Sequence, residues 1–99
     1  MTQGRKRVLV AYDIRDSKRL RKVHKTMVGY GWSMQYSVFI CDLDAMELIA
    51  MKTELGEVIH HAEDSIAMID IGDPSQRGRD CFQFMGVSVP LPTSGPVIL

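Results

Sequence analysis

The run Val8-Leu9-Val10-Ala11-Tyr12-Asp13 decides the fold of this chain. It is short, almost continuously apolar, and rich in β-branched and aromatic residues, which is typical of a central strand covered on both faces. Asp13 ends the run, so its carboxylate is expected beside a loop at the C-terminal end of the strand, where it can protrude from the sheet. Asp13 is therefore the first candidate for a functional residue.

Two amphipathic helices are predicted beyond this strand. Asp16 is a candidate N-cap for the first helix, whose apolar residues recur every three or four positions and for which Gly31 is a natural stop. Asp44 and Glu47 have capping-box spacing at the start of the second helix. Gly56 costs about 1 kcal/mol relative to Ala inside a helix, so we expect the second helix to end or kink there.

Extended segments flank these helices. Residues 32–41 contain β-branched and aromatic residues without Pro or Gly and predict either one bent strand or two, and residues 65–71 predict another strand. The order strand, helix, extended hairpin, helix, strand predicts an α+β fold, the ferredoxin-like β-α-β-β-α-β sandwich. We expect this domain to occupy residues 1–72.

Residues 73–99 are predicted to form a linker, a fifth strand and a tail. Residues 81–89 alternate polar and apolar side chains, with a bulge expected at Gly86. A four-stranded ferredoxin-like sheet has two open edges, so this extra strand is expected to pair with the partner subunit across a two-fold axis. The chain is therefore predicted to be a homodimer.

The charge of the chain is unevenly distributed. The net charge is zero, but residues 1–25 carry nine Lys or Arg against two Asp, which is +7, and the remainder carries three against ten acidic residues, which is −7. At about 100° per residue, the cations of the first helix lie opposite its apolar stripe. The candidate nucleic-acid-binding residues are Arg15, Lys18, Arg19, Arg21, Lys22 and Lys25, with Arg5, Lys6 and Arg7 as further phosphate contacts. The alternative interpretation is a solvated helix face.

Several classes of protein are excluded. No apolar run approaches the roughly 18 residues needed to cross a bilayer, so we expect a cytoplasmic protein that does not bind membranes. Cys41 and Cys81 lack the spacing of a disulfide framework or a zinc site and are interpreted as buried or incidental thiols. His24, His60 and His61 are interpreted as exposed or helix-capping residues.

A set of short motifs in a fixed order resembles a known family. These motifs are Tyr12-Asp13-Ile14, then Asp16, Arg19 and Lys22-Val23, then Tyr30-Gly31, Gln35, Ser37-Val38-Phe39 and Asp64-Ser65-Ile66. Together they resemble the CRISPR-associated protein 2 family. The resemblance implies a ferredoxin-like dimer that holds a short DNA duplex between copies of the CRISPR integrase, CRISPR-associated protein 1.

The resemblance also implies a site around Asp13. Several family members are metal-dependent nucleases, and the position of Asp13 corresponds to a metal ligand, with Tyr12, Ser37 and Phe39 beside it as catalytic residues. Mg²⁺ or another divalent metal takes six oxygen ligands, so one Asp per subunit suffices only when two subunits pair. The simpler alternatives are that Asp13 accepts backbone hydrogen bonds in a turn and that Phe39 only packs.

Three functions are consistent with the sequence. The first is a CRISPR adaptation subunit that dimerises, binds duplex DNA and bridges the integrase during spacer acquisition. The second is a free-standing Mg²⁺-dependent endonuclease that hydrolyses single-stranded RNA or double-stranded DNA. The third is a generic ferredoxin-like regulatory or RNA-binding module, which the fold alone equally allows.

Overall fold

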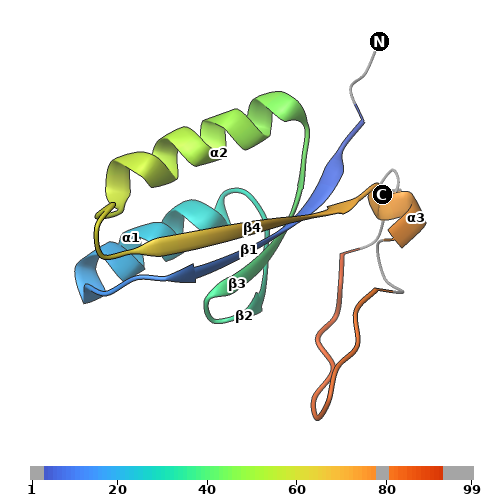
Figure 1. Ribbon diagram of the computed structural model, residues 1–99. Helices are drawn as coiled ribbons and strands as arrows, with labels where there is room; N and C mark the ends of the chain where they lie inside the picture. Colours follow the sequence, from blue (N-terminus) through green and yellow to red (C-terminus); the bar gives the residue numbers. More distant parts are fainter. Residues whose placement is uncertain (1–3, 78–80, 93–99) are drawn as a thin grey trace.

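The computed structural model describes residues 4–77 and 81–92. Its elements are β1 (Lys6–Asp13), α1 (Ser17–Val28), β2 (Trp32–Gln35), β3 (Val38–Leu43), α2 (Ala45–Val58), β4 (Ser65–Gly72) and a short helix α3 (Pro74–Arg77). The four strands form an antiparallel sheet in the order β2-β3-β1-β4. Both long helices cover one face of this sheet (Figure 1). The predicted α+β ferredoxin-like fold is confirmed, and residues 32–41 contribute to two strands rather than one.

The hydrophobic core lies between the helices and one face of the sheet. On β1, Val8, Val10 and Tyr12 point toward the helices and are almost completely buried. Because side chains alternate across a strand, Leu9, Ala11 and Asp13 belong to the opposite, open face. The core is completed by residues of the other elements, among them Val23, Met27, Phe39, Cys41, Leu43, Met51 and Leu55.

Both predicted N-caps are confirmed. The Asp16 carboxylate accepts a hydrogen bond from the Arg19 backbone N–H at 3.0 Å. Asp44 and Glu47 form a reciprocal capping box, with hydrogen bonds of 2.8 and 2.9 Å. Each bond satisfies an N–H group that the first helical turn leaves without a partner.

The predicted helix ends are not both correct. Helix α1 ends at Val28, with Gly29 as its C-cap, so Gly31 is not the stop. Gly31 is instead a site of close approach, because a Cβ there would lie 2.3 Å from the Ile40 carbonyl oxygen. Helix α2 runs through Gly56 to Val58 without interruption, since the tertiary packing of its apolar face outweighs the small cost of one glycine.

The open face of the sheet carries a row of apolar side chains. Leu9 on β1 is paired with Ile40 on β3 and with Ile69 on β4, so these three residues share this face. Ile69 is 46% exposed. A shallow pocket on this side is lined by Leu9, Ile69 and the start of the C-terminal segment, Cys81 to Gln83. The open face is therefore apolar but only partly covered in a single chain.

The segment 81–92 does not form the predicted fifth strand within one chain. It extends away from the two long helices (Figure 1), and none of its residues is paired with the sheet as a strand. Gly86 has a φ of +81° and lies in a bend rather than a bulge. A strand exists only when a neighbouring strand satisfies its backbone groups, so pairing with a partner subunit remains a prediction. Across residues 4–77 and 81–92, no helix has the length and hydropathy of a membrane span.

Candidate functional site

Asp13 is exposed at the C-terminal end of β1, as its position in the sequence predicts. Its backbone pairs with Ser65 at the start of β4, which places the carboxylate on the open face of the sheet. Among the described residues, the Asp13 side chain has no hydrogen bond or ion pair. The alternative in which Asp13 accepts backbone hydrogen bonds in a turn is therefore not what the structure contains.

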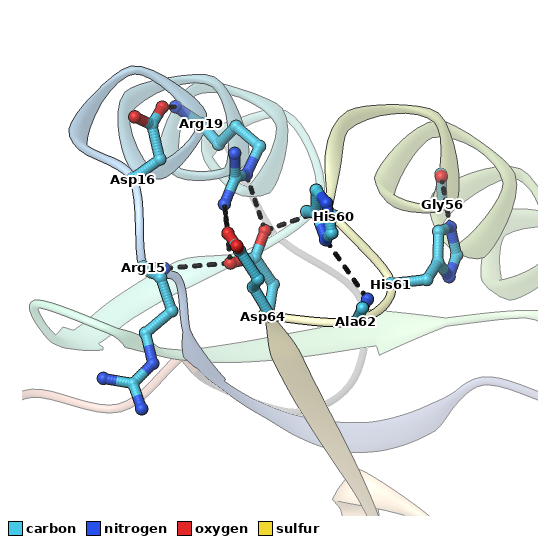
Figure 2. A network of polar contacts seen from close by, with 9 residues as sticks. Arg15, Asp16, Arg19, Gly56, His60, His61, Ala62 and Asp64 are labelled. Atoms are coloured by element: carbon cyan, nitrogen blue, oxygen red, sulfur yellow. Dashed lines mark hydrogen bonds and ion pairs between the residues drawn. The ribbon is translucent and has the colours of Figure 1, made fainter.

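The neighbouring carboxylate of Asp64 is fully occupied by hydrogen bonds (Figure 2). It accepts bonds from the Arg15 backbone N–H at 2.9 Å, the His60 backbone N–H at 2.8 Å, and Arg19 Nε and Nη2 at 2.8 and 3.2 Å. The side chain of Asp64 is completely buried. The Arg19 guanidinium, supported by the two backbone N–H groups, lowers the pKa of Asp64 well below its ordinary value.

The hydrogen-bond network of Asp64 was not predicted from the sequence. It ties together the loop before α1, the loop after α2 and the start of β4, and so fixes the backbone on both sides of Asp13. Asp64 belongs to one of the motifs that carry the family resemblance, and that was the signal available in the sequence. Because its acceptor sites are used, Asp64 cannot serve as a second metal ligand beside Asp13 without breaking the network.

The structure divides the predicted phosphate-binding cations into two groups. Arg19 is used internally, because it pairs with Asp64 and with Glu63, and these bonds raise its pKa. The prediction that Arg19 binds nucleic acid assumed an unpaired guanidinium, and this guanidinium is bound to two carboxylates. Arg19 instead positions the loops around Asp13. The remaining predicted cations form the second group, namely Arg15, Lys18, Arg21, Lys22 and Lys25, which are exposed and have no ion pair within the described residues. In Figure 2 the Arg15 side chain points away from the Asp64 network.

The cations near the N-terminus are also engaged. Arg7 is completely buried and forms a two-pronged ion pair with Asp42 on β3, with N–O distances of 2.7 and 2.8 Å. Arg5 pairs with Glu47, and Lys6 lies 3.4 Å from an Asp70 oxygen. The expectation that Arg7 contacts phosphate is wrong, because a buried arginine bound to a carboxylate has no access to solvent.

Tyr12, Ser37 and Phe39 lie close together, but the Tyr12 and Phe39 side chains are buried on the helix side of the sheet, opposite to the face that carries Asp13. The Tyr12 backbone N–H donates to the Ser37 carbonyl at 3.0 Å, and the Tyr12 and Phe39 rings stack at 6.3 Å between centroids. The Tyr12 hydroxyl donates to the Tyr36 carbonyl at 3.3 Å. Burial, assisted by Tyr36, raises the pKa of Tyr12, so this hydroxyl keeps its proton. These residues support the turn between β2 and β3.

His24 belongs to the same cluster, which contradicts its interpretation as an exposed or capping residue. Its Nδ1 atom lies 3.3 Å from the Tyr12 hydroxyl oxygen, and its ring stacks on Tyr36 and meets Phe39 edge-on. Of the other two histidines, His61 does cap a helix, because its Nε2 lies 2.9 Å from the Gly56 carbonyl oxygen. His24 directly follows Val23, a buried residue of α1. This position beside the apolar stripe was the feature of the sequence that could have predicted a contact between His24 and the sheet.

The Asp13 carboxylate would supply one ligand of a magnesium site. Carboxylate oxygen is the ligand that Mg²⁺ prefers, and one or two carboxylates completed by water and phosphate are sufficient. In the part of the chain that the structure describes, no three His, Cys, Asp or Glu side chains are grouped to hold a metal ion. A second carboxylate for a metal at Asp13 would come from the same residue of a second subunit.

These features define a class of protein: a ferredoxin-like α+β domain with an apolar open sheet face, an exposed aspartate at the end of its first strand and a cationic first helix. The model of the family described as CRISPR associated protein Cas2 matches residues 6–79. The chain belongs to this family.

Individual relatives agree with this assignment. A protein named CRISPR-associated endoribonuclease Cas2 from Geobacter sulfurreducens is 44% identical over 64 residues, which cover 65% of this chain and 67% of the relative. A protein named CRISPR-associated endoribonuclease Cas2 2 from Thermodesulfovibrio yellowstonii is 38% identical over 85 residues, which cover 75% and 93% of the two chains. The crystal structure of Streptococcus pyogenes Cas2 superimposes with a TM-score of 0.72 at 33% identity and covers 81% of this chain and 99% of that one.

Proposed function

We propose that this protein is a cytoplasmic subunit of the CRISPR adaptation machinery that binds duplex DNA along α1 and bridges CRISPR-associated protein 1, the integrase, during spacer acquisition. The observation that carries the proposal is the distribution of cations. Arg5, Lys6, Arg7 and Arg19 are neutralised by carboxylates of the same chain. The exposed cations of α1 and Arg15 have no such carboxylate among the described residues, which leaves a positively charged surface that attracts phosphates without reading base sequence.

The working unit in this proposal is a homodimer. The apolar side chains of Leu9 and Ile69 on the open face favour burial against a second copy, because Leu9 is only partly buried and Ile69 is 46% exposed, and exposed apolar side chains that share one face are typical of an interaction surface. The alternating segment 81–89, which forms no strand in a single chain, would complete the sheet edge of the partner. A two-fold axis through this face would give the dimer two cationic α1 helices, one on each outer side.

A second candidate function is hydrolysis of a phosphodiester in single-stranded RNA or double-stranded DNA. It is favoured by the exposed, unpartnered carboxylate of Asp13 and by the names of the relatives, which include endoribonuclease and endonuclease. In this case the Asp13 side chains of two subunits would hold Mg²⁺, which would supply charge neutralisation at the phosphate. Tyr12, Ser37 and Phe39 would position the turn beside the substrate.

Replacing Asp13 by Ala separates the two functions. We would measure three quantities: duplex binding by fluorescence anisotropy, spacer integration with the integrase, and cleavage of labelled RNA and DNA in Mg²⁺. The adaptation proposal expects binding and integration within about twofold of the wild type, since the Asp13 side chain is exposed and has no hydrogen bond or ion pair in the described part of the chain. The nuclease candidate expects cleavage by the wild type that disappears in the variant.

Glu57→Ala is the matched control, because it removes an exposed acidic side chain on α2 that has no ion pair within the described residues. If Asp13→Ala loses integration and Glu57→Ala keeps it, integration needs the Asp13 carboxylate. This result would refute the proposal that the protein acts only as a DNA-binding bridge. Retention of integration together with absence of any cleavage by the wild type would remove the nuclease function.

A further inference from the structure

Tyr36 is an exposed aromatic side chain that is held in place from behind. It lies in the two-residue turn between β2 and β3, and 65% of the residue is exposed. One face of its ring stacks on His24, with centroids 5.7 Å apart and an angle of 19° between the rings. His24 in turn meets the buried ring of Phe39 edge-on at 5.4 Å. The ring of Tyr36 therefore has a supported inner face and an outer face open to solvent.

The backbone of this turn is also restrained. The Tyr36 carbonyl accepts the Tyr12 hydroxyl at 3.3 Å, and the Ser37 carbonyl accepts the Tyr12 backbone N–H at 3.0 Å. Tyr12 is itself anchored in the core, with 6% of the residue exposed. A turn held by these contacts keeps the Tyr36 ring in one orientation, so less conformational entropy is lost when a ligand packs against it.

One cation of α1 lies on the same side of the helix as this aromatic platform. At 100° per residue, Arg21 is about 60° from His24 around the helix, whereas Lys25 lines a pocket with Tyr30 and Glu54 instead. The Arg21 side chain is exposed and has no ion pair within the described residues. An open aromatic face beside an unneutralised cation is the combination that recognises a base and a neighbouring phosphate in single strands.

We propose that the outer face of Tyr36 stacks an unpaired nucleobase while Arg21 contacts an adjacent phosphate. This inference rests on the proposed binding of nucleic acid and adds to it a subsite for a single-stranded segment, such as the unpaired end of a duplex. The bases inside a duplex are already stacked on each other, so they offer no face to Tyr36. The subsite therefore favours strands with unpaired bases, without preference for one base over another.

The test compares Tyr36→Leu and Tyr36→Phe with the wild type. Leu keeps an apolar side chain but has no aromatic face, whereas Phe keeps the face and loses only the hydroxyl. We would measure binding of a fluorescein-labelled single-stranded oligonucleotide and of a blunt duplex of the same length by anisotropy. For Tyr36→Leu we expect binding of the single strand to weaken by about 5- to 150-fold, which corresponds to the loss of one base–aromatic stack, while duplex binding stays unchanged. Tyr36→Phe should behave as the wild type.

Met46→Ala is the control for loss of an exposed apolar side chain, because Met46 is 74% exposed on α2. A second measurement uses the wild type alone: a single strand carrying 5-iodouracil is photo-cross-linked, and mass spectrometry locates the modified residue. A cross-link to Tyr36 supports the proposal. Cross-linking to other residues only would overturn it.

The outcomes also distinguish this inference from the proposed function on which it rests. If the wild type binds both probes and Tyr36→Leu loses affinity for neither, the subsite is refuted and the binding of duplex DNA stands. If the wild type binds no nucleic acid at low ionic strength, both proposals are refuted. If Tyr36→Leu loses the single strand and the duplex to the same extent, Tyr36 does not select unpaired bases and the inference is again refuted.

Discussion

The cationic face of α1 predicts a particular dependence of DNA binding on salt. Four exposed cations on this helix, Lys18, Arg21, Lys22 and Lys25, are not paired with a carboxylate in the described part of the chain. If each neutralises one phosphate, the slope of log K against log salt is about −3.6 per chain, since each contact contributes about −0.9. Raising the salt from 50 to 200 mM would then weaken wild-type binding by about 150-fold.

The perturbation is the double variant Lys18→Ala/Lys22→Ala. It leaves two helix cations, so the expected slope falls to about −1.8 and the loss over the same salt range to about 12-fold. The assay is an anisotropy titration of a labelled blunt duplex at four or five salt concentrations. The sequence of the duplex should not matter, because phosphate contacts carry no base information.

Arg5→Ala/Lys6→Ala is the matched control, because it removes the same formal charge from cations that are paired with Glu47 and Asp70. Its slope should remain close to that of the wild type. If both double variants reduce the slope equally, the effect comes from net charge and not from α1, and the reasoning is refuted. An unchanged slope in Lys18→Ala/Lys22→Ala would refute it as well.

Two further predictions concern the buried ion pairs. Asp42→Ala removes the two-pronged ion pair of Asp42 with the buried Arg7 guanidinium and should lower the free energy of unfolding by about 3–5 kcal/mol, measured by urea denaturation. A loss below about 1 kcal/mol would show that the pair behaves like a surface ion pair. The second prediction concerns acid stability: the pKa of Asp64 is lowered in the folded state by Arg19, so its contribution is fully present above the ordinary value of 3.8 and is lost as the pH falls below it toward the folded value. Urea midpoints measured between about pH 6 and pH 2 should fall less steeply for Asp64→Asn than for the wild type, and parallel curves would contradict the assignment.

Much of the fold could be predicted because local chemistry and periodicity agree along the chain. The apolar run ending at Asp13, the N-cap at Asp16 and the capping box of Asp44 and Glu47 all appear where the pattern indicates. Helix ends were less predictable. Gly31 is required by the close approach of the Ile40 backbone rather than by the termination of α1, and such an approach is invisible before the strands and helices are packed.

The candidate site was predicted in part. The sequence indicated the exposed carboxylate of Asp13 and the cations of α1, but it could not separate free cations from neutralised ones. Arg19 and Arg7 have partners 45 and 35 residues away in the chain. His24 was missed because its contacts come from β1, from β3 and from the turn between β2 and β3.

By itself, then, the sequence determined the order of strands and helices, the helix starts, the amphipathic and cationic character of α1 and the family. These properties depend on residues that are close together in the sequence and on the spacing of motifs, so they can be read from the sequence without the fold. Only the tertiary structure decided which charges are cancelled, that Asp64 joins three segments, and that Tyr36 stands on His24 with one face open. Those outcomes depend on distances between residues far apart in the chain, and only folding brings such residues together.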